Sequence, residues 1–166
     1  MISHSRLKEL LDYDPNTGTF TRKVSLNSNT KVGDVAGNLT HGYVELSVEG
    51  VTYRAHNLAW FYMTGRWPNG LIDHRNLDKS NNSFRNLREA KYQQNSANTA
   101  RQRNNSLGLK GVTRHGNKFK AAVTVNRKRH HLGVFDCPRA AAEAYDKAAA
   151  AHFGEFARTN RQLGYI

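Results

Sequence analysis

The chain has 166 residues, enough for one ordinary domain or two small ones. Its formal net charge of +12 and pI near 10.1 indicate an anionic partner, nucleic acid or an anionic membrane, and argue against an enzyme of small metabolites. The longest apolar stretch, Leu58 to Met63, is far too short to cross a bilayer, which makes nucleic acid the stronger reading. A lone cysteine, Cys137, excludes an intramolecular disulfide and a zinc knuckle, so folding must rest on packing.

The N-terminal block, roughly residues 7–70, predicts a small α+β region. Residues 1–6 lack the apolar core of a signal peptide, so the chain is expected in the cytoplasm where it is made. The expected elements are a short amphipathic helix over 7–13, a turn over 14–18, a strand over 19–22, a β-hairpin of strands 42–48 and 51–55, and a helix over 56–64 that Gly65 ends.

The second block, residues 71–98, contains the most informative pattern of the chain. An apolar lead delivers Asp73 and His74 at a strand end, a polar loop follows over 75–84, and residues 87–89 return as a second short strand. A helix from Lys91 then carries Asn95 toward the pair. An imidazole beside a carboxylate suits metal-assisted phosphodiester hydrolysis. The imidazole can take a proton from water, while carboxylate and amide oxygens hold a hard divalent cation.

The order Asp73-His74, Asn81-Asn82, Asn86-Leu87-Arg88, Asn95 resembles the HNH nuclease motif of the ββα-metal superfamily. Phage-type HNH homing endonucleases are the most similar group. The resemblance implies that His74 activates the attacking water and that Asn86 orients His74 by bridging the loop. It also implies that Asp73 and Asn95 bind one divalent metal, Mg²⁺ with Mn²⁺ as a possible substitute.

Several residues near this motif have weaker assignments. Asn98, one turn beyond Asn95, is the competing metal ligand. Asn81 and Asn82 are expected to stabilise the loop. His56 matches a histidine that commonly precedes the motif, and we expect it to pack or to form a hydrogen bond without a catalytic role. The loop over 75–78 lacks a glycine that is common in the family.

The third block combines a basic segment with a predicted sheet. Residues 99–107 are polar and poor in hydrophobic side chains, which predicts a linker that could lie along a phosphate backbone. Strands are expected over 111–115, 118–126 and 129–135, with a turn at Arg127-Lys128. An alanine-rich helix follows, capped by Asp136 or Cys137 with Pro138 in its first turn, and Gly154 ends it.

No acidic residue occurs from Thr99 to His131. The pattern Gly-Val, Lys-Phe-x-Ala, Leu-Gly-x-Phe, Ala-Tyr-Asp-x-Ala-Ala and Thr-Asn over residues 106–160 resembles the plant ethylene-response-factor (APETALA-two) DNA-binding domain. The resemblance implies that the sheet enters the major groove with the helix behind it. Carried over by position, the DNA-facing residues are Lys110, Thr113, His115, Lys118, Lys120, Thr124, Arg129 and His131, and the linker adds Arg101 and Arg103. Four of them, Thr113, His115, Thr124 and His131, stand where plant members usually have Arg or Trp, so only the docking mode transfers.

The sequence therefore predicts an α+β chain with two functional parts. The first part is a ββα-metal HNH nuclease domain over 1–98, in which a small β-hairpin-containing region precedes the motif core over 71–98. The second part is a three-stranded antiparallel sheet packed on one helix over 108–160. A basic linker over 99–107 joins them, and a tail covers 161–166. The expected activity is metal-dependent nicking or cleavage of double-stranded DNA by a monomer, in the bacterial host cytoplasm if the chain is phage-encoded. A DNA-binding regulator with a non-catalytic HNH scaffold is the alternative. An RNA-directed protein is a third reading, which the lack of paired aromatic side chains on the strands disfavours.

Overall fold

A computed structural model describes residues 1–25, 30–102 and 105–166 of the chain. The chain divides into two compact units, Met1–Ala90 and Lys91–Ile166. This division differs from the expected boundaries at 98 and 107, because α3 (Tyr92–Ala97) and the segment that follows it belong to the second unit. In the described parts of the chain, no helix has the length and apolarity to cross a membrane.

The first unit begins with α1 (His4–Leu10), whose N-cap is Ser3. The Ser3 hydroxyl accepts a hydrogen bond from the Arg6 backbone N–H at 3.2 Å, which satisfies one of the unpaired donors of the first turn. The helix ends earlier than expected, and the chain continues as β1 (Leu11–Asp14). Burial alternates along β1, with Leu11 and Tyr13 inside, which is the period of a strand and not of a helix.

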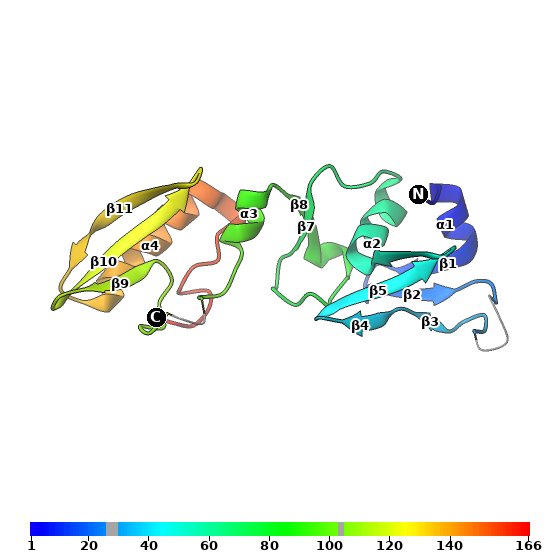
Figure 1. Ribbon diagram of the computed structural model, residues 1–166, viewed down its shortest axis with the longest axis horizontal. Helices are drawn as coiled ribbons and strands as arrows, with labels where there is room; N and C mark the ends of the chain where they lie inside the picture. Colours follow the sequence, from blue (N-terminus) through cyan, green and yellow to red (C-terminus); the bar gives the residue numbers. More distant parts are fainter. Residues whose placement is uncertain (26–29, 103–104) are drawn as a thin grey trace. The chain divides into compact units, whose positions relative to one another are not determined.

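Two small antiparallel sheets follow in the first unit (Figure 1). One has the order β1-β2-β3, with β2 (Thr19–Arg22) and β3 (Val35–Ala36), and the other joins β4 (Asn38–Thr40), β5 (Tyr43–Val48) and β6 (Val51–Arg54). The hairpin of β5 and β6 and the following α2 (Ala55–Thr64) were predicted and are confirmed. Gly65 ends α2 in the left-handed conformation, at φ 73°. The strands β1, β3 and β4 were not predicted, since each has at most four residues and so carries too little of the alternating pattern of a strand.

The apolar core of the first unit connects these sheets to the motif. Leu7, Leu58 and Phe20 are almost completely buried in it. Ile72 and Leu87 belong to the same core, and they lie on β7 (Leu71–His74) and β8 (Leu87–Ala90). These strands form a two-stranded antiparallel sheet, and η1 (Phe84–Asn86) leads into β8. The motif strands are therefore anchored by apolar packing.

In the second unit one helix covers one face of a three-stranded sheet (Figure 1). The sheet has the order β11-β10-β9, built from β9 (Val112–His115), β10 (Lys118–Val125) and β11 (Lys128–Phe135), and the helix is α4 (Pro138–Phe153). The turn between β10 and β11 is Asn126-Arg127, one residue earlier than predicted, because Val125 pairs with Lys128. Cys137 is the N-cap of α4, without a side-chain cap hydrogen bond.

Small residues let α4 approach the sheet closely. Ala121 of β10 and Ala141 and Ala142 of α4 have no exposed surface. The chain end is part of this unit and is not a free tail: η2 (Gly154–Phe156) follows α4, and Tyr165 and Ile166 pack against the same core. The last six residues therefore contribute to the fold.

Candidate active site

Asp73 and His74 are the last two residues of β7, and both are buried, with 3% and 5% of their surface exposed. Arg88 of β8 stands directly opposite Asp73 in the strand pairing. Its Nε and Nη2 each donate to Oδ2 of Asp73 at 2.8 Å. Because Arg88 is itself 7% exposed, this is a buried ion pair in which one charge compensates the other.

The His74 imidazole has a defined partner in Asn82. Its Nε2 lies 3.3 Å from Oδ1 of Asn82, while Nδ2 of Asn82 donates to the Ser80 carbonyl at 3.0 Å. The amide oxygen of Asn82 therefore faces the ring, and Nε2–H of the neutral imidazole is the donor. In this tautomer the basic lone pair belongs to Nδ1.

Burial keeps this imidazole in its neutral form. Removal from water lowers the pKa of His74 below its ordinary value, and this effect exceeds the opposing influence of the Asn82 hydrogen bond and of the carboxylates of Asp73 and Asp78. A neutral imidazole at neutral pH can accept a proton, as a general base must.

The N-terminal hairpin supports the loop that presents Asn82. The Tyr13 hydroxyl, on β1, donates to the Asn82 carbonyl at 2.7 Å, and the Phe84 N–H donates to the Pro15 carbonyl at 2.8 Å. At Gly18, with φ +79°, an added Cβ would lie 2.2 Å from the Asn82 carbonyl carbon. Only glycine fits this turn against the loop.

Asn86 connects the two limbs of the loop. Its Oδ1 accepts from the Asn76 N–H at 3.0 Å, and its Nδ2 donates to the Asn81 carbonyl at 2.7 Å. The resemblance to HNH enzymes implied a bridging role of this kind. Asn86 acts here on the loop backbone, while Asn82, expected only to stabilise the loop, contacts the imidazole itself.

His56 and Tyr43 pack around His74. The rings of His56 and His74 are edge to face, with centroids 5.1 Å apart, and the Tyr43 ring lies 5.5 Å from His56. Burial lowers the pKa of His56 to about 3, and the nearby His74 and Arg54 contribute to this lowering. His56 thus has the packing role expected of it, as a neutral ring beside the candidate base.

The oxygen donors near His74 fit a hard divalent cation. A carboxylate offers about four lone-pair sites, so the Arg88 contact to Asp73 does not exhaust its capacity. Among the described residues, no group of three or more His, Cys, Asp or Glu side chains gathers in one place. Asn95 lies on α3 in the second unit, partly buried, and Asn98 follows that helix, so their metal-binding roles stay predictions.

In the second unit, the strand register gathers most of the predicted DNA-facing residues on one face. Cross-strand partners share a face. Lys118 pairs with His115, Lys120 with Thr113, Thr124 with Arg129, and Ala122 with His131. The neighbouring residues, such as Ala121, are buried on the side of α4. We call the face opposite α4, formed by Thr113, His115, Lys118, Lys120, Thr124, Arg129 and His131, the outward face.

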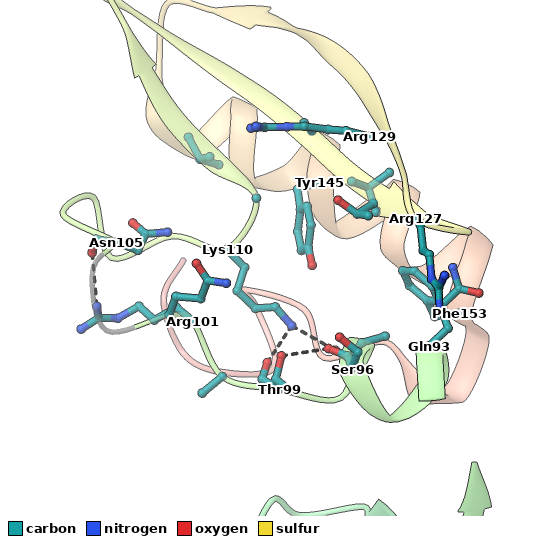
Figure 2. A pocket seen from close by; sticks show the side chains of 18 of the residues that line it. Gln93, Ser96, Thr99, Arg101, Asn105, Lys110, Arg127, Arg129, Tyr145 and Phe153 are labelled. Carbon is teal, nitrogen blue, oxygen red and sulfur yellow. Dashed lines mark hydrogen bonds between the residues drawn. The ribbon is translucent and has the colours of Figure 1, made fainter. Parts of the chain in front are cut away.

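Lys110 does not lie on this face, which corrects the sequence prediction. Its ammonium donates to the carbonyl of Thr99 at 2.7 Å (Figure 2). It also donates to the carbonyls of Ala97 at 3.1 Å and Arg158 at 2.7 Å. The side chain is buried, and burial lowers its pKa to about 8. Lys110 thus connects the start of the predicted linker, at Thr99, to the rest of the second unit. Arg101 is exposed, and Arg103 lies outside the described residues.

Three features of the site were not predicted from the sequence: Arg88 as the ion-pair partner of Asp73, Asn82 as the partner of His74, and Tyr13 as a support for the loop. The Arg88 contact had a signal, since pairing the two predicted strands places it opposite Asp73. Tyr13 had none, because 69 positions separate it from Asn82.

Comparison with known proteins gives this geometry a context. Residues 53–97 match the family model described as HNH endonuclease. Over 98 residues the chain is 35% identical to an uncharacterized HNH endonuclease of Acanthamoeba polyphaga mimivirus, an alignment that covers 58% of this chain and 51% of the relative. The chain thus spans about half the length of the curated relative it matches. The resemblance of the motif to HNH nucleases is confirmed: the chain contains an HNH endonuclease domain.

Proposed function

We propose that the chain is a metal-dependent DNA endonuclease of the ββα-metal type that hydrolyses phosphodiester bonds. The observation that carries the proposal is the environment of His74. Its imidazole is held neutral by burial, oriented by Asn82, and next to an oxygen donor in Asp73. All of these residues fall within the segment that matches the HNH family.

The proposed chemistry assigns one task to each side chain. His74 takes a proton from the attacking water at Nδ1, and the Asn82 oxygen accepts the hydrogen bond of Nε2–H as the ring becomes an imidazolium. Asn86 keeps the loop in register and so positions Asn82. A divalent cation, Mg²⁺ or Mn²⁺, held by Asp73 would stabilise the charge that develops on the phosphate and on the leaving 3′ oxygen.

The second unit supplies DNA binding in this proposal. Its outward face carries three cationic side chains and no acidic one among its seven residues, as in the APETALA-two type of sheet. Part of the affinity for double-stranded DNA is then independent of sequence and falls steeply with salt. A monomer with one base nicks one strand, and the likeness of the motif to phage-type enzymes supports a site-directed, homing role.

Relaxation of supercoiled plasmid tests the proposal. Wild type should nick the plasmid with Mg²⁺ or Mn²⁺, EDTA should abolish nicking, and His74→Ala should lose about 10²- to 10⁴-fold of the rate. His41→Ala is the matched control, because it removes an exposed histidine of the same unit. Nicking that survives in His74→Ala would contradict the assignment of the base.

Binding and cleavage assays with the same proteins distinguish two other functions from the proposed one. A regulator with a non-catalytic HNH scaffold would protect DNA in a footprint and cut none of a library of sequences. The buried Asp73–Arg88 pair and the oriented His74 favour the nuclease over it. An RNA-directed protein would prefer RNA over duplex DNA in competition.

A further inference from the structure

A groove of about 940 Å³ opens in the second unit beside the end of β10 (Figure 2). Strand β9 pairs with β10 only over Lys118–Ala121, so the last residues of β10 extend beyond it. Residues of α3 and of the segment 99–102 also line the groove. Figure 2 shows Lys110 and Tyr145 directed toward its middle, with Arg101 and Arg127 at opposite ends.

The groove is strongly cationic. Its lining includes the charged side chains of Lys91, Arg101, Lys110, Arg127 and Arg129, and no Asp or Glu among the described residues. Four of the five are exposed; the fifth, Lys110, is buried. A concave surface with one sign of charge concentrates anions, and a polymer of phosphates is the anion that can contact several of these side chains at once.

Arg127 occupies a backbone conformation that its residue type disfavours. It forms a two-residue hairpin turn with Asn126, and both have positive φ, at 62° and 52°. Asn and Gly suit such turns, whereas the Cβ of arginine is crowded in the left-handed region. Strain of this kind tends to persist where the side chain has a task, and this guanidinium lines the groove.

The groove is continuous with the outward face. Thr113, Thr124 and Arg129 belong to both. We infer that the groove binds the sugar–phosphate backbone of one strand of duplex DNA whose bases face the outward face. The inference rests on the proposed function, because it takes duplex DNA as the ligand of that face. Besides the contact of the bases with the outward face, the inference gives DNA a second contact at the edge of the sheet, between its phosphates and the side chains of Arg127 and Arg101.

A pair of glycine variants tests the inference. Arg127→Gly removes the cation and relieves the left-handed backbone, while Asn126→Gly relieves the same turn and removes no charge. Binding of the full chain to a labelled random-sequence duplex is measured by fluorescence anisotropy in EDTA, which prevents cutting, over a KCl series. Arg127→Gly should bind more weakly than wild type and lower the slope of log affinity against log salt by about 0.9, the value for one phosphate contact. Asn126→Gly should retain the slope.

Melting temperature separates this result from misfolding. Arg127→Gly should melt at or above the wild-type temperature, so that stability and affinity change in opposite directions. If it melts lower, Arg101→Gln tests whether the groove contacts phosphates. Its control is Lys147→Gln, at an exposed residue of α4 outside the groove. A reduced slope in the first and an unchanged slope in the second support the groove.

The outcomes also separate the inference from the proposed function. Wild type that binds no duplex at any salt contradicts both. Wild type that binds and nicks, with Arg127→Gly and Arg101→Gln equal to their controls, contradicts the groove alone. A loss confined to single-stranded oligonucleotides would also overturn it. That result would instead assign the groove to separated strands, for which the exposed ring of Tyr92, 79% accessible, offers a stacking surface.

Discussion

Arg88 and Asp73 face each other across β7 and β8, and two N–H groups of the guanidinium bind one carboxylate oxygen at 2.8 Å. Each is less than a tenth exposed. The ion pair thus holds a negative charge next to His74 inside the protein, where a lone carboxylate would be strongly disfavoured.

Removing one partner of this pair should lower the free energy of unfolding much more than removing both. Arg88→Met leaves the carboxylate uncompensated and should lower the free energy of unfolding by about 3–5 kcal/mol, and Asp73→Asn added to it should restore most of the loss. Both tryptophans, Trp60 and Trp67, lie in the first unit, so their fluorescence in a urea titration reports its unfolding.

The control is a second ion pair on the same strand. Arg66 binds Glu89 at 2.6 Å, but the Arg66 side chain is 49% exposed. Arg66→Met should therefore change stability by only about 0–1 kcal/mol. Equal losses in Arg66→Met and Arg88→Met would contradict the importance of burial.

The contact of Asn82 with His74 predicts a change in the pH profile. A carboxylate in place of the amide, in Asn82→Asp, should raise the pKa of His74, because a negative charge favours the imidazolium. More of the base is then protonated at a given pH, so nicking should decline on the acid side and reach its plateau at higher pH than in wild type. Single-turnover nicking rates from pH 5 to 8 give the profile.

Asn81→Asp provides the comparison for that variant. It places the same charge one residue away, where the side chain binds Ser83. Its profile should lie closer to that of wild type. Identical profiles for all three proteins would rule out the proposed coupling between residue 82 and the base.

Gly18 should tolerate no side chain because the loop that presents Asn82 lies against it. Gly18→Ala brings a Cβ to 2.2 Å from the Asn82 backbone, whereas Gly42, with a similar φ of +82°, has no atom within 4 Å of an added Cβ. Both variants place an L-residue at positive φ, and Gly18→Ala should lose about 1–3 kcal/mol more from overpacking. It should also nick more slowly, while Gly42→Ala retains the wild-type rate per folded molecule.

His56 makes the first unit sensitive to acid. With a folded pKa of about 3 and an unfolded value of about 6.5, the unfolded chain binds a proton that the folded one does not. The contribution of neutral His56 to the free energy of unfolding is then complete above pH 6.5. It is lost as pH falls toward 3, by up to about 1.4 kcal/mol per pH unit. His56→Phe should lose less stability than wild type in this window.

Urea titrations at pH 7.0, 5.5 and 4.5 measure this difference. The phenylalanine retains an aromatic ring against His74 and removes Nδ1 of His56, which is buried without a hydrogen-bond partner among the described residues. His41→Phe, an exposed position, should follow the wild-type pH dependence. A wild-type protein equally stable at pH 7.0 and 4.5 would contradict the burial of a neutral His56.

The features that sequence could predict are those with local signals. The β5–β6 hairpin, α2, and the strands and helix of the second unit each carry their own period and their own Gly or Pro boundary. The Asp73-His74 pair was visible because its neighbours are spaced in a recognisable order. Contacts between distant segments were not visible: the support of Asn82 by Tyr13 depends on how β1 packs, and no nearby residue encodes it.

Lys110 shows why a matching position can mislead. In the aligned pattern it was one more cation near a DNA-binding sheet, yet its backbone N–H is bound by Asn160, whose side chain is fully buried, at 2.6 Å. This anchoring turns the side chain toward the carbonyls of other segments. Charge alone therefore did not distinguish a surface residue from an internal one.

The same lysine joins segments that lie far apart in the chain. Its ammonium donates to the carbonyls of Ala97, the last residue of α3, of Thr99 just beyond it, and of Arg158, which follows η2. A replacement that looks harmless in a basic sequence, such as glutamine for lysine, would remove the ammonium that makes all three hydrogen bonds. One polar side chain thus connects the stretch after α3 to the segment that follows η2, although 48 positions separate Lys110 from Arg158.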